Sequence, residues 1–175
     1  MVENSRLGIV KCSVEDTLAL REFALVAFKE AFEAYNNPDD FAAYVAKAFD
    51  TANLRSELEN PASAFYFAKS GNEIVGYLKV NFPGAQTDSF GDDCLEIERI
   101  YTTSTHFGKG IGEVLMAKAM DIAQAHQFAF IWLGVWEENA RAIRFYEKQG
   151  YTVFGKHDFW MGNDLQHDLL MRKNC

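Results

Sequence analysis

The sequence is short of the residue types that mark several classes of protein. It has only three prolines and three cysteines in 175 residues, and no apolar run approaches the roughly 20 residues that span a bilayer. Few prolines argue against a long linker, and the widely spaced cysteines form no disulfide framework. No spacing of His and Cys is typical of a metal site. We therefore expect one domain over residues 1–175, with reduced thiols, no bound metal and no membrane partner.

The chain also lacks an excess of basic residues. Residues 1–100 contain 17 acidic and 9 basic side chains, and residues 101–175 contain 8 of each. Nucleic acid binding requires clustered Lys and Arg, so we expect no nucleic acid partner. The acidic first hundred residues suit either a cationic small molecule or simple solubility. Residues 1–6 lack the charged-then-apolar order of a secretory signal, which predicts a cytoplasmic protein.

What the chain does have is enough apolar sequence for a substantial core, at 49% apolar and 14% aromatic residues. Alternating or continuous apolar patterns predict strands over 7–12, 64–69, 74–81, 95–102, 128–135, 152–160 and 165–171. Helical spacing predicts helices over 13–36, 39–49, 51–60, about 110–122 and 139–149. This order predicts a mixed α/β domain whose middle sheet is covered on both sides.

Local signals place several boundaries. Ser13 and Asp16 have the spacing of a capping box at a helix start, and Ser70–Glu73 has the chemistry of a hairpin turn. The helix after residue 109 has an apolar stripe of Ile111, Leu115, Ala119 and Ile122. Strict alternation over 95–102 predicts Leu95, Ile97, Arg99 and Tyr101 on one face and Glu96, Glu98 and Ile100 on the other.

The most informative segment is the glycine-rich turn Phe107–Gly112, between a predicted strand and a predicted helix. Glycines at 108, 110 and 112 permit a sharp turn and a close approach of the backbone to a ligand. The N–H groups in the first helical turn have no intrahelical partner, so they suit a diphosphate. The spacing matches neither the P-loop nor the dinucleotide motif. A flexible loop leading into a helix is the alternative.

A second segment follows the next strand. Asn139 is placed to cap a helix, and Tyr146 lies seven residues later, on nearly the same face two turns along. This pair could contact one elongated ligand, and the alternative is an ordinary cap followed by a half-buried aromatic.

Together the two segments, with the pattern N-x-x-A-I-x-F-Y-x-K-x-G-Y in the second, resemble the GNAT superfamily of acyl-CoA N-acyltransferases. Further runs are similar to bacterial spermine/spermidine acetyltransferases of the Pai type, namely residues 76–81, 95–101, 132–137 and 155–159. The resemblance implies an α/β (α+β) fold, with a mixed, mostly antiparallel seven-stranded sheet. It also implies helices on both faces and a splay between the fourth and fifth strands.

The resemblance also implies an acetyl-CoA site. Ile100 and Tyr101 would pair by their backbone with the pantetheine arm, and Asn139 would bind the same arm. Tyr146 would face the thioester sulfur, and Lys148 would approach the phosphoadenosine end. The diphosphate would be held by Gly108, Lys109, Gly110, Ile111, Gly112 and Glu113. Phe107 departs from the pattern, because the family usually has Gln or Arg there, and this removes a polar contact.

Acetyl transfer to an amine needs a proton acceptor, because a primary amine near pKa 10 is almost wholly protonated at pH 7. Related polyamine acetyltransferases have a glutamate at an offset best matched by Glu98, so Glu98 is the first candidate and Glu96 the second. Two solvated strand carboxylates are the alternative. Tyr146 would protonate the leaving thiolate. A covalent route through Cys94 lacks an assigned base.

The leading hypothesis is direct acetylation of spermidine or spermine. Its candidate acidic partners are Glu30, Glu33, Asp39, Asp40, Glu57, Asp88, Asp92 and Asp93. The alternatives are an acetyltransferase for a protein lysine, a protein N-terminus or another small amine, a CoA-binding regulatory module, and a structural interaction domain. A homodimer is left open.

Overall fold

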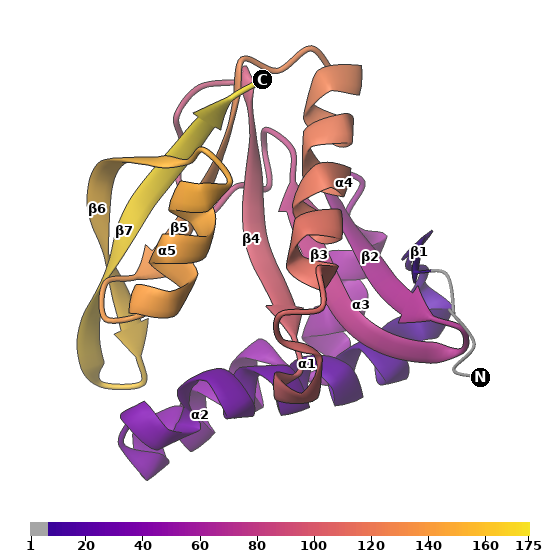
Figure 1. The fold of residues 1–175 in the computed structure, drawn as a ribbon. Coiled ribbons are helices and arrows are strands. Elements are labelled where there is room, and N and C mark those ends of the chain that lie inside the picture. The colour runs from indigo at the N-terminus through magenta and orange to yellow at the C-terminus, as the bar shows by residue number, and fades with distance from the viewer. Residues whose placement is uncertain (1–6) are drawn as a thin grey trace.

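In the computed structural model, which describes residues 7–175, the chain forms one seven-stranded sheet with helices on both faces (Figure 1). The strands are β1 (Leu7–Lys11), β2 (Ser63–Ser70), β3 (Glu73–Asn81), β4 (Cys94–Thr102), β5 (Phe130–Trp136), β6 (Thr152–Met161) and β7 (Asp164–Asn174). The α-helices are α1 (Thr17–Phe32), α2 (Pro38–Ala48), α3 (Thr51–Glu59), α4 (Ile111–Ala125) and α5 (Ala140–Lys148). The prediction that residues 1–6 are not a secretory signal concerns residues outside the described range.

The sheet has the order β1-β2-β3-β4-β5-β7-β6, and only β4 and β5 pair in parallel. Their ladder ends at Ile97 and Leu133, although β4 continues to Thr102 and β5 to Trp136. Beyond that pair the two strands share no hydrogen-bonded ladder. The predicted splay between the fourth and fifth strands is therefore confirmed.

Two apolar clusters lie on opposite faces of the sheet. On one face, α4 contributes Ile111, Leu115, Ala119 and Ile122, and this predicted stripe is buried. On the other face, α1, α2 and α3 pack aromatic and aliphatic side chains against β2 and β3, with Leu20, Phe41 and Leu54 among them. The predicted two-sided cover is confirmed, and it leaves the gap between β4 and β5 bounded by helices on each side.

The strict alternation predicted for β4 is wrong beyond Ile97. Val80 pairs with Ile97 but its neighbour Lys79 pairs with Arg99, so Glu98 is an extra residue in β4. A β-bulge of this kind shifts the phase of the side chains that follow it. Ile97 packs in the cluster beneath α4, whereas Tyr101 packs with α1 on the opposite face.

The predicted helix start is confirmed, because the Ser13 N–H donates to the Asp16 carboxylate at 2.8 Å and the Ser13 hydroxyl accepts from Glu15 N–H at 3.3 Å. This box opens a short 3₁₀ turn, Val14–Asp16, from which α1 continues. The three cysteines carry free thiols. Among residues 7–175, no helix is both long and apolar enough to cross a membrane.

Candidate active site

A cavity of about 820 Å³ opens where β4 and β5 part. One part of its wall comes from the glycine-rich turn, the first turn of α4 and the first two turns of α5. Another part comes from α1, β6, β7 and residues 87–88 of the loop between β3 and β4. The cavity thus joins the two faces of the sheet through the gap between its central strands.

The glycine-rich turn enters this cavity with two residues in the left-handed region. Gly108 has φ 71° and Gly110 has φ 78°, a conformation that L side chains adopt at a cost. Gly112 has a different role, because a Cβ there would lie 3.0 Å from the ring of Phe145 in α5. The residues that line the cavity here are Gly108, Gly110, Ile111, Gly112 and Glu113, while Lys109 is exposed outside it.

The first turn of α4 has no side-chain cap, so its backbone donors are open to the cavity. Gly110 caps α4 by its backbone alone, and the first intrahelical bond of this turn runs from Val114 N–H to Gly110 O. The preceding N–H groups have no intrahelical acceptor, and the helix dipole adds to their positive potential. A diphosphate fits these donors.

Predicted pantetheine contacts lie on both sides of the gap. Ile100 and Tyr101 line the cavity and pair with β3, while their other strand edge lies beyond the last β4–β5 pair. Backbone groups on that edge are free to pair with an extended ligand. Asn139 caps α5 by accepting from Ala142 N–H at 3.1 Å, and it also lines the cavity. The free edge of β4 and the start of α5 thus face the same cavity.

Tyr146 is buried and lines the cavity, next to the rings of Phe145 and Tyr151. Burial raises the pKa of its phenol, so the hydroxyl stays protonated at neutral pH and can donate. Lys148 lies in the last turn of α5, exposed and outside the cavity wall. Of the two α5 residues predicted beyond the cap, only Tyr146 reaches the cavity.

Sequence reasoning missed Arg141, which lies in the first turn of α5. Its guanidinium is stacked 3.5 Å from the centre of the Phe107 ring, and both residues line the cavity. A cation held on an aromatic face is stabilised by the ring quadrupole. Phe107 therefore positions a positive charge beside the glycine-rich turn. Nothing in the sequence pairs these two positions, which are 34 residues apart.

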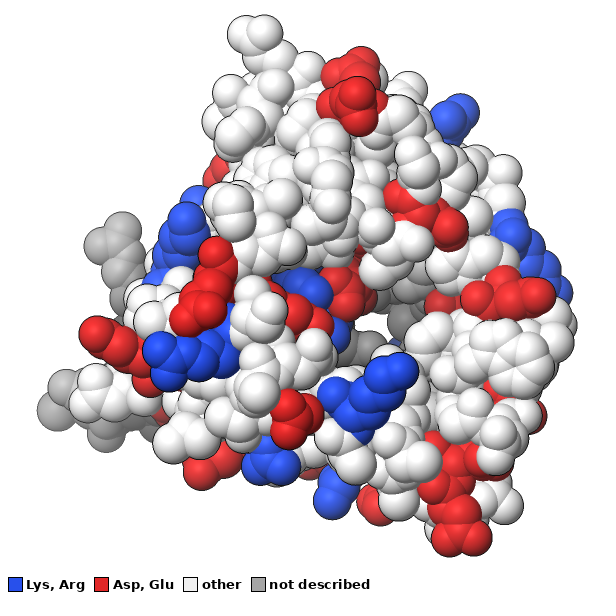
Figure 2. All heavy atoms as spheres, turned by 180° about the vertical axis from the view of Figure 1, so that it is seen from behind, with Lys and Arg blue, Asp and Glu red and all other residues white. Residues whose placement is uncertain are grey.

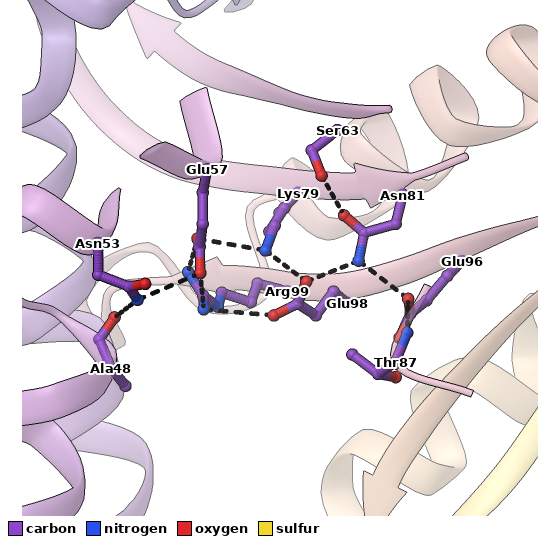
Figure 3. Close-up of polar contacts among 10 residues, drawn as sticks. All are labelled: Ala48, Asn53, Glu57, Ser63, Lys79, Asn81, Thr87, Glu96, Glu98 and Arg99. Carbon is purple, nitrogen blue, oxygen red and sulfur yellow. Dashed lines mark hydrogen bonds and ion pairs between the residues drawn. The ribbon is translucent and has the colours of Figure 1, made fainter. Parts of the chain in front are cut away.

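Glu98 belongs to a network of charges shown in Figure 3. It pairs with Lys79 at 2.5 Å and with Arg99 at 3.2 Å, and both cations also contact Glu57 of α3. Burial alone would raise the pKa of Glu98, but Arg99 and Lys79 outweigh burial and lower it. Glu98 is therefore held as a carboxylate with little tendency to take a proton.

Glu96 is only 2% exposed and lies at the other end of the same network. Asn81 Nδ2 donates to Glu96 at 2.9 Å and to Glu98 at 2.6 Å, and Thr87 N–H donates to Glu96 at 2.9 Å. Burial raises the pKa of Glu96, and these hydrogen bonds offset that rise only in part. Both glutamates line the cavity, but the pKa of Glu96 is raised and that of Glu98 is lowered.

Of the predicted acidic partners, only Asp88 lines the cavity. Glu30 accepts from Ser104 N–H, Asp40 from Asn163 N–H and Asp93 from Ala129 N–H, all outside the cavity wall. The sequence reasoning missed two further carboxylates in that wall, Asp158 of β6 and Asp168 of β7. Glu33, Asp39, Glu57 and Asp92 also lie outside the wall.

Cys94 is fully buried, does not line the cavity, and burial raises the pKa of its thiol. Its Sγ contacts Gln86 Oε1 at 3.4 Å and Gly91 O at 3.5 Å. A buried thiol without a basic partner is a poor nucleophile.

Within residues 7–175, no cluster of His, Cys, Asp and Glu is arranged to hold a metal ion. On the face shown in Figure 2, Lys and Arg are interspersed with acidic side chains.

The model of the acetyltransferase (GNAT) family matches residues 21–151. An uncharacterized N-acetyltransferase in the pepI 3′ region of Lactobacillus delbrueckii subsp. lactis is 35% identical over 165 residues, or 94% of this chain and 95% of that protein. A streptothricin acetyltransferase of Streptomyces lavendulae is 33% identical over 114 residues, or 63% of this chain and 57% of that protein.

Among solved structures, the PaiA N-acetyltransferase from Thermoplasma acidophilum in complex with coenzyme A has a TM-score of 0.78. It is 21% identical to this chain, and the match covers 97% of this chain and 99% of that one. At this identity the likeness shows the fold. With the family match and the relatives, it leads to one conclusion: the chain belongs to the acetyltransferase (GNAT) family and is an acetyl-CoA-dependent N-acetyltransferase.

Proposed function

We propose that the acceptor is a primary amine with further positive charge, a polyamine such as spermidine or spermine being the leading candidate. The charge of the cavity wall carries this proposal. Asp88, Glu96, Asp158 and Asp168 line the part away from the glycine-rich turn. His157 lies among them and contacts Asp88 and Asp168, so these four carboxylates still outnumber the positive charge that it adds. Arg99 lines the cavity too, but Glu57 and Glu98 neutralise it. A cationic acceptor would be attracted to such a wall.

Acetyl-CoA supplies the acetyl thioester, and the fit rests on the features described above. The first turn of α4 would hold the diphosphate, and the free edge of β4 at Ile100 and Tyr101 would pair with the pantetheine arm. A backbone N–H on that edge would also donate to the thioester carbonyl oxygen; losing such a donor typically costs about 3 kcal/mol. Asn139 would hold the arm from the opposite side.

Glu96 is the better proton acceptor, which reverses the order of preference expected from the sequence. The neutral fraction of an alkylamine is about one in a thousand at pH 7, so its proton must be removed before attack. Glu98 is committed to Lys79 and Arg99, whereas Glu96 has a raised pKa and neutral partners. A carboxylate of raised pKa is a stronger base. The proton of the ammonium would pass to Glu96, directly or through water.

The acetyl group then passes directly from the thioester to the amine, without a covalent enzyme intermediate. The amine nitrogen uses its lone pair to form a bond to the acetyl carbon, and the carbon–sulfur bond breaks. The electron pair leaves on the sulfur of CoA, whose ordinary thiol pKa is about 8.5. Tyr146 donates its phenolic proton to that sulfur, and the second proton, which the nitrogen loses as the amide forms, restores the phenol directly or through water. The buried Cys94 takes no part.

Arg141 should support acetyl-CoA binding. Because its guanidinium is fixed on Phe107 beside the glycine-rich turn, Arg141→Ala should raise the KM for acetyl-CoA about tenfold, the value of one charge-assisted hydrogen bond. The kcat should change little. Arg144→Ala is the matched control, because Arg144 is exposed on the same helix and does not line the cavity. Equal KM values for the two variants would contradict this role.

The acceptor class is tested by steady-state kinetics with acetyl-CoA and a panel of amines. The panel holds spermidine, spermine, a monoamine of similar length and a lysine-containing peptide. We expect the highest kcat/KM with the polyamines, and a loss of their advantage at high salt, which screens the acidic wall. Strong peptide activity beside weak polyamine activity would favour a protein acceptor. Tight CoA binding with no turnover of any amine would favour a regulatory module.

A further inference from the structure

Three consecutive residues in the loop between β3 and β4, Gln86 to Asp88, tie this loop to strands β4, β5 and β6. Gln86 donates to Cys94 O at 2.8 Å and accepts from Trp132 Nε1 at 3.1 Å, which fixes the segment to β4 and β5. Thr87 donates to Glu96 through both its N–H, at 2.9 Å, and its hydroxyl. The third residue, Asp88, contacts β6, and the Gln86–Asp88 segment thus crosses the acceptor side of the cavity.

Asp88 is bound by His157 of β6, whose Nδ1 contacts the Asp88 carboxylate. The other ring nitrogen, Nε2, lies 3.4 Å from the carboxylate of Asp168 in β7. Gly134 of β5 lies beside this pair, where a Cβ would be in ordinary contact at 3.5 Å from His157 Nε2 and 3.4 Å from Asp168 Oδ2. His157 therefore connects the Gln86–Asp88 segment to the far strands of the sheet.

We propose that His157 is a positioning residue: by holding Asp88 it fixes Thr87, and Thr87 orients the Glu96 carboxylate that accepts the proton of the amine. This inference rests on the proposed role of Glu96. His157 is not the proton acceptor itself, because both of its ring nitrogens are taken by carboxylates. His157 also lines the cavity, and it acts on the reaction through Thr87 and Asp88, which line the wall beside Glu96.

The charges around His157 favour its protonated form. Burial alone would lower the pKa of His157, but Asp88 from the loop and Asp168 from β7 outweigh burial and raise it. Gly134 of β5 adds no charge here, and Glu137, which raises the pKa of Asp168, is paired with Lys156 at 2.6 Å. An imidazolium between two carboxylates makes stronger hydrogen bonds than a neutral ring.

This raised pKa gives the contact a defined pH dependence. A group whose pKa is higher in the folded protein stabilises it fully below the unfolded value, which is about 6.5 for histidine, and less as pH rises through the folded value. The free energy of unfolding of the wild type should therefore exceed that of His157→Gln most at about pH 6, and the difference should shrink by about pH 9. Urea denaturation at the two pH values measures it. A difference that grows with pH would contradict a protonated His157.

Amide hydrogen exchange tests the contact without any turnover. In His157→Gln we expect the Thr87 N–H to exchange at least about tenfold faster than in the wild type, because the loop opens more often. His167→Gln is the matched control, since His167 contacts the exposed Asp158 at 3.0 Å and does not line the cavity. It should leave the exchange of Thr87 unchanged. Unchanged exchange in His157→Gln would overturn the proposal, whichever amine is the acceptor.

A double-mutant cycle with Glu96→Gln then tests the consequence for catalysis, with the amine of highest turnover. As a single substitution, His157→Gln should lower kcat about tenfold and leave the KM for acetyl-CoA unchanged. Added to Glu96→Gln, it should lower kcat no further. Additive losses, or a rise in the KM for the amine at unchanged kcat, would show a direct role for His157 and overturn the proposal. Full activity of Glu96→Gln alone would refute the base assignment and this role of His157, whereas the exchange result would still stand.

Discussion

Replacing Glu96 by glutamine should lower kcat by about 100- to 1000-fold, the usual contribution of a positioned general base. Glutamine has nearly the same shape and can still accept from Thr87 and Asn81, so the loss should come from the missing base. The KM for acetyl-CoA should stay close to the wild-type value, because Glu96 lies away from the glycine-rich turn. Steady-state rates with saturating amine measure this effect.

Glu98→Gln is the control that separates the two glutamates. Because Glu98 is a partner of Lys79 and Arg99, its loss should mainly reduce stability, by about 2 kcal/mol, since Glu57 still contacts both cations. Its kcat should fall far less than that of Glu96→Gln. The wild-type kcat should also decline as pH falls through the raised pKa of Glu96, and this decline should be absent from Glu96→Gln. The reverse order of kcat losses would restore Glu98 as the base.

Removing the phenolic hydroxyl of Tyr146 is the second change with a large expected effect. Tyr146→Phe keeps the ring that packs on Phe145 and Tyr151, so the fold should be preserved. The variant lacks the proton donor for the leaving sulfur, and kcat should fall about 100-fold at neutral pH. The rate of CoA thiol release measures this change.

Tyr151→Phe provides the comparison for Tyr146→Phe. Tyr151 is also buried, and its ring touches that of Tyr146, but it does not line the cavity. It should retain nearly the wild-type kcat. If Tyr146→Phe also retained it, another group or water would have to protonate the sulfur.

Sequence reasoning succeeded where the cause of structure is local. The Ser13 capping box, the stripe of Ile111 and Leu115, and the turn at Gly71 each depend on neighbours within a few residues. The same is true of Asn139 as a helix cap. These signals located the elements and the two segments that line the cavity, while the splay of the sheet was expected only from the family resemblance.

The features it missed depend on contacts between distant residues. The bulge at Glu98 comes from pairing with β3, and it reversed the expected direction of Tyr101. Arg141 reaches Phe107, and His157 reaches Asp88, only after the strands and helices have assembled. The difference between Glu96 and Glu98 has the same origin, because it is set by the partners that the fold brings to each.

The acidic wall also differs in origin from what the charge distribution suggested. The acidic excess lies in residues 1–100, yet Asp158 and Asp168 come from the last hairpin, where acidic and basic residues balance. Meanwhile Glu30 and Asp40 accept hydrogen bonds from backbone N–H groups elsewhere. Local pairing in the fold, rather than regional net charge, decides which carboxylates face an acceptor.

We propose that the acetyl group passes directly from acetyl-CoA to a polyamine in this cavity. The most direct test is mass spectrometry of both the protein and the small molecules after reaction with acetyl-CoA and spermidine. We predict one N-acetylated spermidine for each CoA thiol released and a protein of unchanged mass. Release of CoA without acetylated spermidine, or an acetylated protein that forms before the product, would contradict the account.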